Sequence, residues 1–111
     1  MTMTLQQKAE ASALVHRVIG FARMGTMPHQ AVATSAADRL EALADSEVMT
    51  PESVQVAREV LANLRAGVLP TVQRCSDAMD EVNEFRLPLN RQCRSERAGA
   101  AEAPQAPRER G

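Results

Sequence analysis

The stretch VIGFARMGTMP at residues 18–28 recurs 42 residues later as VLANLRAGVLP at residues 60–70. Valine, arginine, glycine and proline are identical in the two copies, and three further positions hold similar residues. Glycine can adopt the left-handed conformation that ends a helix, and proline suits the first position of the next helix. Arginine in the last turn suits the negative end of the helix dipole. Each copy therefore predicts a tight connection between two antiparallel helices.

The similarity continues downstream of the two connections. The same register pairs four more positions, Ala36/Ala78, Asp38/Asp80, Leu40/Val82 and Leu43/Phe85. A duplicated helical hairpin explains this pattern, and so does independent use of Gly-x-x-Pro, a common punctuation between helices. The sequence leaves both explanations open. Because a helical solenoid needs about three repeats for stability, we expect two hairpins to pack against each other as a small four-helix bundle.

Apolar residues at helical spacing predict four helices, over residues 4–24, 28–44, 50–66 and 70–88. The third helix has a clear start, because Thr50 suits the N-cap, Pro51 the first helical position and Glu52 the positive helix end. No segment alternates like a strand, so the predicted fold is all-α. Phe21 and Phe85, the only aromatic residues, are expected in the cores of the first and second hairpins.

From about Asn90 onward the composition changes. Residues 91–111 contain five arginines, three glutamates, two prolines and no large apolar residue. Such a segment buries too little surface to offset the entropy of ordering it. We therefore predict a bundle domain at residues 1–89 and a flexible tail at residues 90–111. The alternative is a continuation of the fourth helix that places Arg91, Arg94 and Arg97 on one face.

Length and composition exclude several function classes. The 111 residues suffice for one domain. With 2% aromatic residues the chain lacks stacking platforms for single-stranded nucleic acid, and its net charge of −1 argues against polyanion binding by total charge. No run approaches the ~20 apolar residues of a membrane span, and the N-terminus lacks the pattern of a secretory signal, so we expect a cytoplasmic protein. The excess of arginine over lysine is typical of GC-rich bacteria and their phages.

The two cysteines form neither a metal motif nor a CxxC redox pair. Cys75 falls on an apolar helix face, where we expect a buried, inert thiol. Cys93 lies among Arg91, Arg94 and Arg97, whose positive charges could favour the thiolate. A reactive thiol at Cys93 is therefore an alternative to an inert one.

Four acidic residues of the fourth helix, the acidic strip, are the candidate partner-binding residues. Asp77, Asp80, Glu81 and Glu84 are spaced i, i+3, i+4 and i+7, so they share one helix face. One interpretation is a docking strip for a basic partner, and the other is a solvated face that keeps the domain soluble. No metal is expected there, because four carboxylates on one exposed helix do not form a cage and no histidine joins them.

We find no pattern that predicts catalysis. His29 is expected at the edge of the core in the first turn of the second helix, without a carboxylate to orient it or a nucleophile to activate. His16 is expected on the polar side of the first helix. The sequence has no Gly-rich phosphate loop, nucleophile elbow or HExxH motif. We therefore predict neither an enzyme nor a cofactor.

The sequence favours a non-enzymatic protein–protein interaction module: an adaptor, an inhibitor or a regulatory subunit that binds a partner protein. The alternative is a small nucleic-acid-associated regulator that uses Gln55, Arg58, Asn63 and Arg65 of the third helix together with the basic tail. About 90 folded residues with an aliphatic, alanine-rich core give a marginal domain. Self-association would remove that marginality, so a homodimer is consistent with the composition.

Overall fold

The structure, a computed structural model, describes residues 3–105 of the chain and the side chains of residues 3–97. Four α-helices follow one another: α1 (Leu5–Arg23), α2 (Gln30–Asp45), α3 (Gln55–Arg65) and α4 (Val72–Gln105). A short 3-10 helix, η1 (Pro51–Val54), precedes α3. No strand occurs within the described residues. The prediction of an all-α fold with four helices is confirmed.

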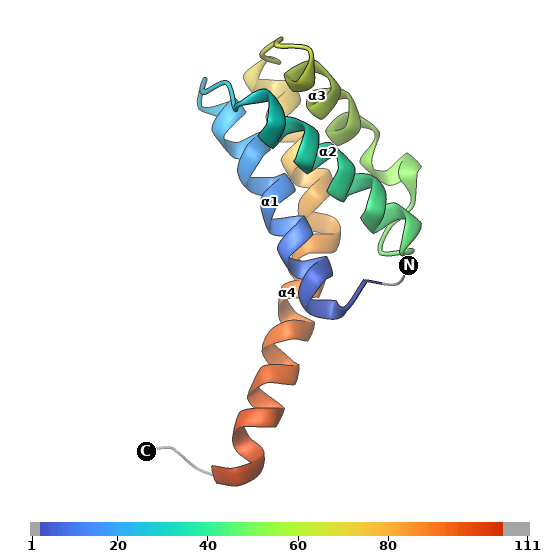
Figure 1. The fold of residues 1–111 in the computed structure, drawn as a ribbon, viewed down its shortest axis with the longest axis vertical. Coiled ribbons are helices and arrows are strands. Elements are labelled where there is room, and N and C mark those ends of the chain that lie inside the picture. The colour runs from blue at the N-terminus through green and yellow to red at the C-terminus, as the bar shows by residue number, and fades with distance from the viewer. Residues whose placement is uncertain (1–2, 106–111) are drawn as a thin grey trace.

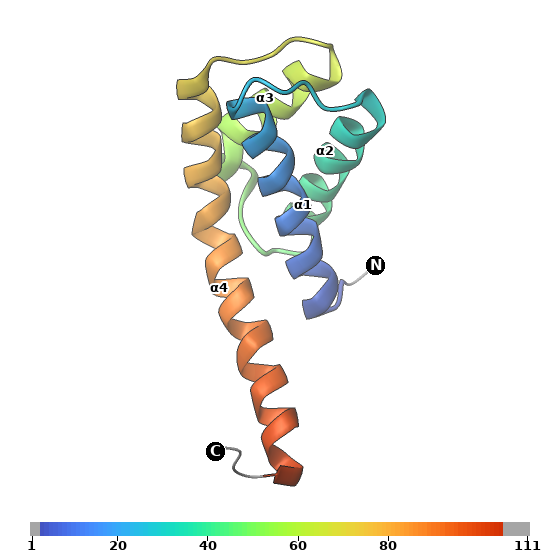
Figure 2. The same ribbon diagram turned by 90° about the vertical axis from the view of Figure 1, so that its left-hand side faces the viewer.

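The four helices form a bundle in which each helix runs opposite to the one before it (Figure 1). α1 packs against α2 and α4, and α3 packs against the same two helices from the other side. The contact between α1 and α4 is the most extensive. The α1–α2 and α3–α4 connections consequently lie together at one end of the bundle, which we call the loop end (Figures 1 and 2).

The two connections at the loop end have the same backbone geometry. Gly25 and Gly67 follow the C-caps of α1 and α3 and have φ values of 90° and 81°. In the first connection the N–H of Thr26 donates to the carbonyl of Phe21 at 2.9 Å, and the equivalent bond in the second spans 2.8 Å. This is the Schellman pattern, which explains why glycine stands at both positions. Whether the hairpins arose by duplication stays a prediction.

The starts of α2, α3 and α4 differ from the prediction. The third helix was expected to start at Thr50 and Pro51, yet Thr50 caps the 3-10 helix η1 and α3 begins at Gln55. Pro28 was expected to open α2, yet α2 begins at Gln30 and its N-cap is His29, whose Nδ1 accepts from the N–H of Ala31 at 3.1 Å. α4 likewise begins two residues after Pro70. Proline has no side-chain group that accepts a hydrogen bond. In α2 and α4 the polar residue that follows the proline therefore takes the N-cap position.

The core contains the apolar stripes of all four helices. Its buried members are Ala11, Val15, Val18, Ile19, Ala22, Ala33, Ala36, Leu40, Leu43, Val54, Ala57, Val60, Leu61, Leu64, Cys75, Ala78, Val82, Phe85 and Leu89. The expectation that Phe21 lies in the core is wrong, because its residue surface is 49% exposed. Val32 of α2 and Val72 of α4 lie at helical spacing from the buried Ala36 and Cys75 but are also exposed. All three lie near the loop end. Ala22, one residue nearer that end than Phe21, is buried, so Phe21 is exposed because its side of α1 faces away from the core.

The predicted end of the fourth helix near Pro88 is wrong, because α4 continues through Pro88 to Gln105. Proline removes one helical hydrogen bond, but Phe85 and Leu89 on either side of it are buried against the bundle and hold the helix together. The segment after Leu89 is rich in arginine, glutamine and alanine, which favour helix even in solvent. α4 therefore projects beyond the other helices (Figure 2). The predicted flexibility of the tail stays a prediction, and residues 106–111 lie outside the described residues.

Candidate interaction surfaces

The structure gives the four residues of the acidic strip different surroundings. Asp80 and Glu84 are exposed, and no side-chain hydrogen bond to either occurs within the described part of the chain. Asp77 is half-buried and accepts a hydrogen bond from Nε2 of Gln73 at 2.9 Å. Two of the four carboxylates are therefore fully available to a partner.

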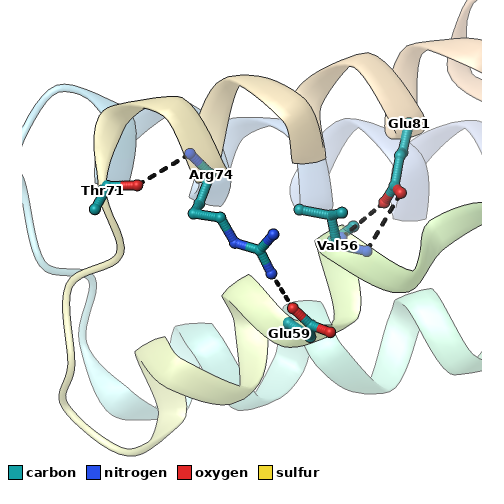
Figure 3. Close-up of polar contacts among 6 residues, drawn as sticks. Val56, Glu59, Thr71, Arg74 and Glu81 are labelled. Carbon is teal, nitrogen blue, oxygen red and sulfur yellow. Dashed lines mark hydrogen bonds and ion pairs between the residues drawn. The ribbon is translucent and has the colours of Figure 1, made fainter.

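Glu81 has a role inside the fold. Its Oε1 accepts from the backbone N–H of Ala57 at 2.8 Å, and its Oε2 lies 3.3 Å from the backbone nitrogen of Val56 (Figure 3). The N-cap position of α3, Val54, supplies no side-chain acceptor. The carboxylate of α4 therefore satisfies N–H groups at the start of α3 that would otherwise lack a partner, and its negative charge faces the positive helix end.

A second polar contact joins the same two helices. The guanidinium of Arg74 on α4 pairs with the carboxylate of Glu59 on α3 (Figure 3). The hydroxyl of Thr71 accepts from the backbone N–H of Arg74 at 3.2 Å and so caps α4. These groups fix α3 against the first half of α4, which makes that side of α4 structural.

The two histidines belong to different elements, His16 to α1 and His29 to the N-cap of α2. His29 is exposed and caps α2, as described above. His16, expected on the polar side of α1, is half-buried, and its pKa is lowered first by burial and then by the positive charge of Arg86. Within the described residues no group of three or more His, Cys, Asp or Glu side chains could hold a metal ion.

The cysteines occupy opposite parts of α4. Cys75 is fully buried, and burial raises the pKa of its thiol although the charge of Arg23 opposes this shift. The prediction of a buried Cys75 is confirmed. Cys93 is half-buried, with its Sγ 3.8 Å from the carbonyl oxygen of Leu5. Its reactivity stays a prediction.

Large exposed apolar side chains gather at the loop end. Seven of the eight in the described part of the chain lie in or beside the two connections, and we call them the loop-end patch: Phe21, Met24, Met27, Val32, Val68, Leu69 and Val72. Met24 is the most exposed of them, at 80%. The eighth, Leu87, lies on α4.

A hydrogen bond joins the two hairpins at the loop end. The side-chain amide of Gln30 donates to the carbonyl of Arg65 at 3.0 Å, which joins the start of α2 to the end of α3. Beside this bond lies a groove of about 330 Å³, lined by Met27, Pro28, Gln30, Leu64, Arg65, Ala66 and Gly67. The exposed arginines Arg23 and Arg65 stand next to the apolar side chains. The patch is thus an apolar surface with a positive rim.

This surface was not predicted from the sequence. Phe21 was expected in the core, and no binding surface was expected at the connections. A pattern was available, because turn residues are usually polar or glycine, whereas Met27, Val68 and Leu69 stand between the glycine and the proline of the connections. Apolar residues in a tight, exposed turn indicate a surface that something else covers.

Comparison with protein-family models, with curated proteins and with solved structures gave no match. Among the described residues, none of the helices has the length and apolarity that crossing a membrane requires.

Proposed function

We propose that the protein is a non-enzymatic protein-binding module, an adaptor, inhibitor or regulatory subunit, and that its partner binds at the loop-end patch. The observation that carries this proposal is the concentration of seven of the eight exposed large apolar side chains at one end of the bundle. Exposed apolar residues scattered singly are normal, whereas their concentration on one part of the surface is typical of interaction sites.

The composition of the loop-end patch suits recognition of a protein. Phe21 supplies a large ring of the type that anchors interfaces, and Met24 and Met27 are flexible side chains that adapt to different apolar surfaces. The groove between the connections has room for an apolar side chain of the partner. Arg23 and Arg65 on the rim favour a partner with acidic residues around its apolar contact.

The acidic strip is a weaker candidate for the partner's binding site than the loop-end patch. Glu81 serves the start of α3 and Asp77 is half-buried, which leaves only Asp80 and Glu84 fully exposed. Isolated surface charges contribute little binding free energy, because water solvates them well. An apolar contact is therefore the stronger source of affinity.

The experiment places a photoreactive amino acid at Val68 and, as a control, at Gln92, which is exposed on α4 far from the patch. We expect adducts with a partner protein in the native host from position 68 and none from position 92. Replacing Met24 and Leu69 by serine should reduce these adducts about tenfold, equivalent to 1.4 kcal/mol. Both side chains are exposed, so unfolding by urea should be almost unchanged. Equal adducts from both positions, or adducts insensitive to the serines, would contradict the proposal.

The nucleic-acid alternative has less support. Arg58 of α3, one of the residues proposed to contact nucleic acid, pairs with Glu41 of α2 at 2.8 Å, so its positive charge is already neutralised. The exposed Arg91, Arg94 and Arg97 on α4 keep the alternative open to test. It requires duplex binding that weakens with salt, and a gel-shift measurement at low salt would eliminate it if no shift occurred.

A further inference from the structure

Five exposed residues of α4 form a continuous stripe, which we call the α4 stripe. Asp80, Glu84, Leu87, Arg91 and Arg94 follow one another at spacings of four, three, four and three residues, so they lie on one helix face. All five are exposed. The buried residues of α4 lie on the opposite face: Cys75, Ala78, Val82, Phe85 and Leu89. The bundle therefore leaves the whole α4 stripe open.

Charge along the α4 stripe changes sign at its centre. Asp80 and Glu84 come first, Leu87 lies in the middle with 44% of its surface exposed, and Arg91 and Arg94 follow. The helix dipole does not explain this order, since its effect is confined to the first and last turns, and α4 begins at Val72 and ends at Gln105. Within a single helix the order is unfavourable, because like charges three or four residues apart repel.

We propose that the α4 stripe pairs with the α4 stripe of a second copy of this chain, antiparallel and centred on Leu87. In that register Asp80 lies opposite Arg94 of the second copy, and Glu84 lies one residue from alignment with Arg91 of the second copy. Leu87 meets Leu87 of the second copy on the two-fold axis. Each acidic residue then faces an arginine, and the exposed leucines cover each other.

A second copy fits this surface better than an unrelated partner does. A purely basic or purely acidic partner would pair with one half of the α4 stripe and be repelled by the other half. A two-fold axis at Leu87 satisfies both halves with one surface, as an isologous interface requires. It also places the projecting half of each α4 alongside the first half of the other, which covers a helix that otherwise stands alone in solvent (Figure 2).

The composition of the α4 stripe sets the strength of this pairing. Four of its five residues are charged and one is apolar, so the interface is small and mainly ionic. Exposed ion pairs are individually weak and are screened by salt. We therefore expect a reversible dimer that forms at low salt and dissociates as the salt concentration rises. Its two loop ends would point in opposite directions and remain free.

The decisive experiment uses two charge-reversed full-length variants. Variant A carries Asp80→Arg and Glu84→Arg, so its stripe is entirely positive, and variant B carries Arg91→Glu and Arg94→Glu, so its stripe is entirely negative. Sedimentation equilibrium of the pure proteins at low salt should show a dimer for the unaltered chain. Each variant alone should associate at least about tenfold more weakly. An equimolar mixture of A and B should recover a heterodimer, since every opposed pair is again attractive.

Two controls separate this surface from general charge effects. Glu96 is exposed on α4 but lies off the stripe, so Glu96→Arg should leave the dimer unchanged. Leu87→Cys, in a Cys93→Ser background, should form an interchain disulfide under mild oxidation much faster than Asp80→Cys does. In an antiparallel pair only position 87 meets its own counterpart. Equal crosslinking at positions 80 and 87 would overturn the antiparallel register.

The proposal does not depend on the partner proposed for the loop end, because every measurement uses the pure protein. A monomer at low salt, or variants A and B that associate as the unaltered chain does, would overturn it. Neither result would bear on crosslinking at Val68. Conversely, the failure of Val68 to capture a partner would leave the pairing of α4 untouched.

Discussion

α1 and α3 open the two halves of the bundle, and they obtain acceptors for their first N–H groups in different ways. At the start of α1, Thr4 accepts from the N–H of Gln7 at 3.0 Å, and the side chain of Gln7 accepts from the N–H of Thr4 at 2.9 Å. At the start of α3 the acceptor is Glu81, 24 residues from Ala57 along the chain. α1 can therefore begin on its own, whereas the start of α3 depends on α4 being in place.

Of the substitutions that test this comparison, Glu81→Ala is expected to cause the largest loss of stability. It leaves the N–H groups of Val56 and Ala57 without their acceptor, and hydrogen bonds to a charged group contribute about 1.5–3 kcal/mol each. The hydrogen bond from Val56 to Glu81 is the longer and therefore the weaker of the two. We expect a total loss of about 2–3 kcal/mol in the free energy of unfolding, measured with urea.

Two matched variants complete that measurement. Glu84→Ala removes an exposed carboxylate three residues away and should change stability by less than about 0.5 kcal/mol. Thr4→Ala removes the local cap of α1 and should cost about 1 kcal/mol. If Glu81→Ala costs no more than Thr4→Ala, the carboxylate of α4 is not the main acceptor for α3.

The next largest effect concerns the two helix connections, which have the same backbone geometry in both halves of the bundle. A Cβ at Gly25 or Gly67 would meet no atom within 4 Å, so the cost of Gly→Ala comes from the positive φ alone. We expect each substitution to cost roughly 1–2 kcal/mol, and the two costs to agree because the turns share one geometry. Urea unfolding of the two single variants measures this. Clearly unequal costs would show that the two turns are not energetically equivalent.

Gly20 gives a smaller effect of opposite sign. It lies inside α1 at the position where the repeat in α3 has Ala62. A Cβ at Gly20 would lie 3.7 Å from Cε of Met79, which is an ordinary contact. Alanine has the higher helix propensity, so Gly20→Ala should stabilise the protein by about 0.5–1 kcal/mol, seen as a raised urea midpoint. A loss of stability would mean that α1 and α4 cannot accommodate one methyl group.

The features that depend on neighbours in sequence were predictable, and those that depend on distant packing were not. The helices, the two glycine turns and the cap at Thr50 follow from local pattern. In the sequence Glu81 could not be distinguished from an exposed acidic residue, because its hydrogen bonds to the start of α3 form only when α3 packs against α4. Phe21 was expected in the core because it is one of two large rings, but its side of α1 is exposed, as is the equivalent Asn63 of α3. Pro88 looked like a helix end because the packing that carries α4 through it is tertiary.

The smallest expected effect lies in the contact between the two halves, at His16 of α1. Burial and the charge of Arg86 lower the pKa of His16 below its ordinary value of 6.5, so the folded protein binds this proton less readily than the unfolded chain does. The associated stability is complete above pH 6.5 and is lost as the pH falls through the folded-state pKa. In a His29→Asn background, which leaves one histidine, His16→Gln should flatten the fall in melting temperature on mild acidification. Arg86→Gln should flatten it only in part, because burial, the larger cause, remains. Identical acid profiles for all three proteins would show that protonation of His16 does not oppose folding.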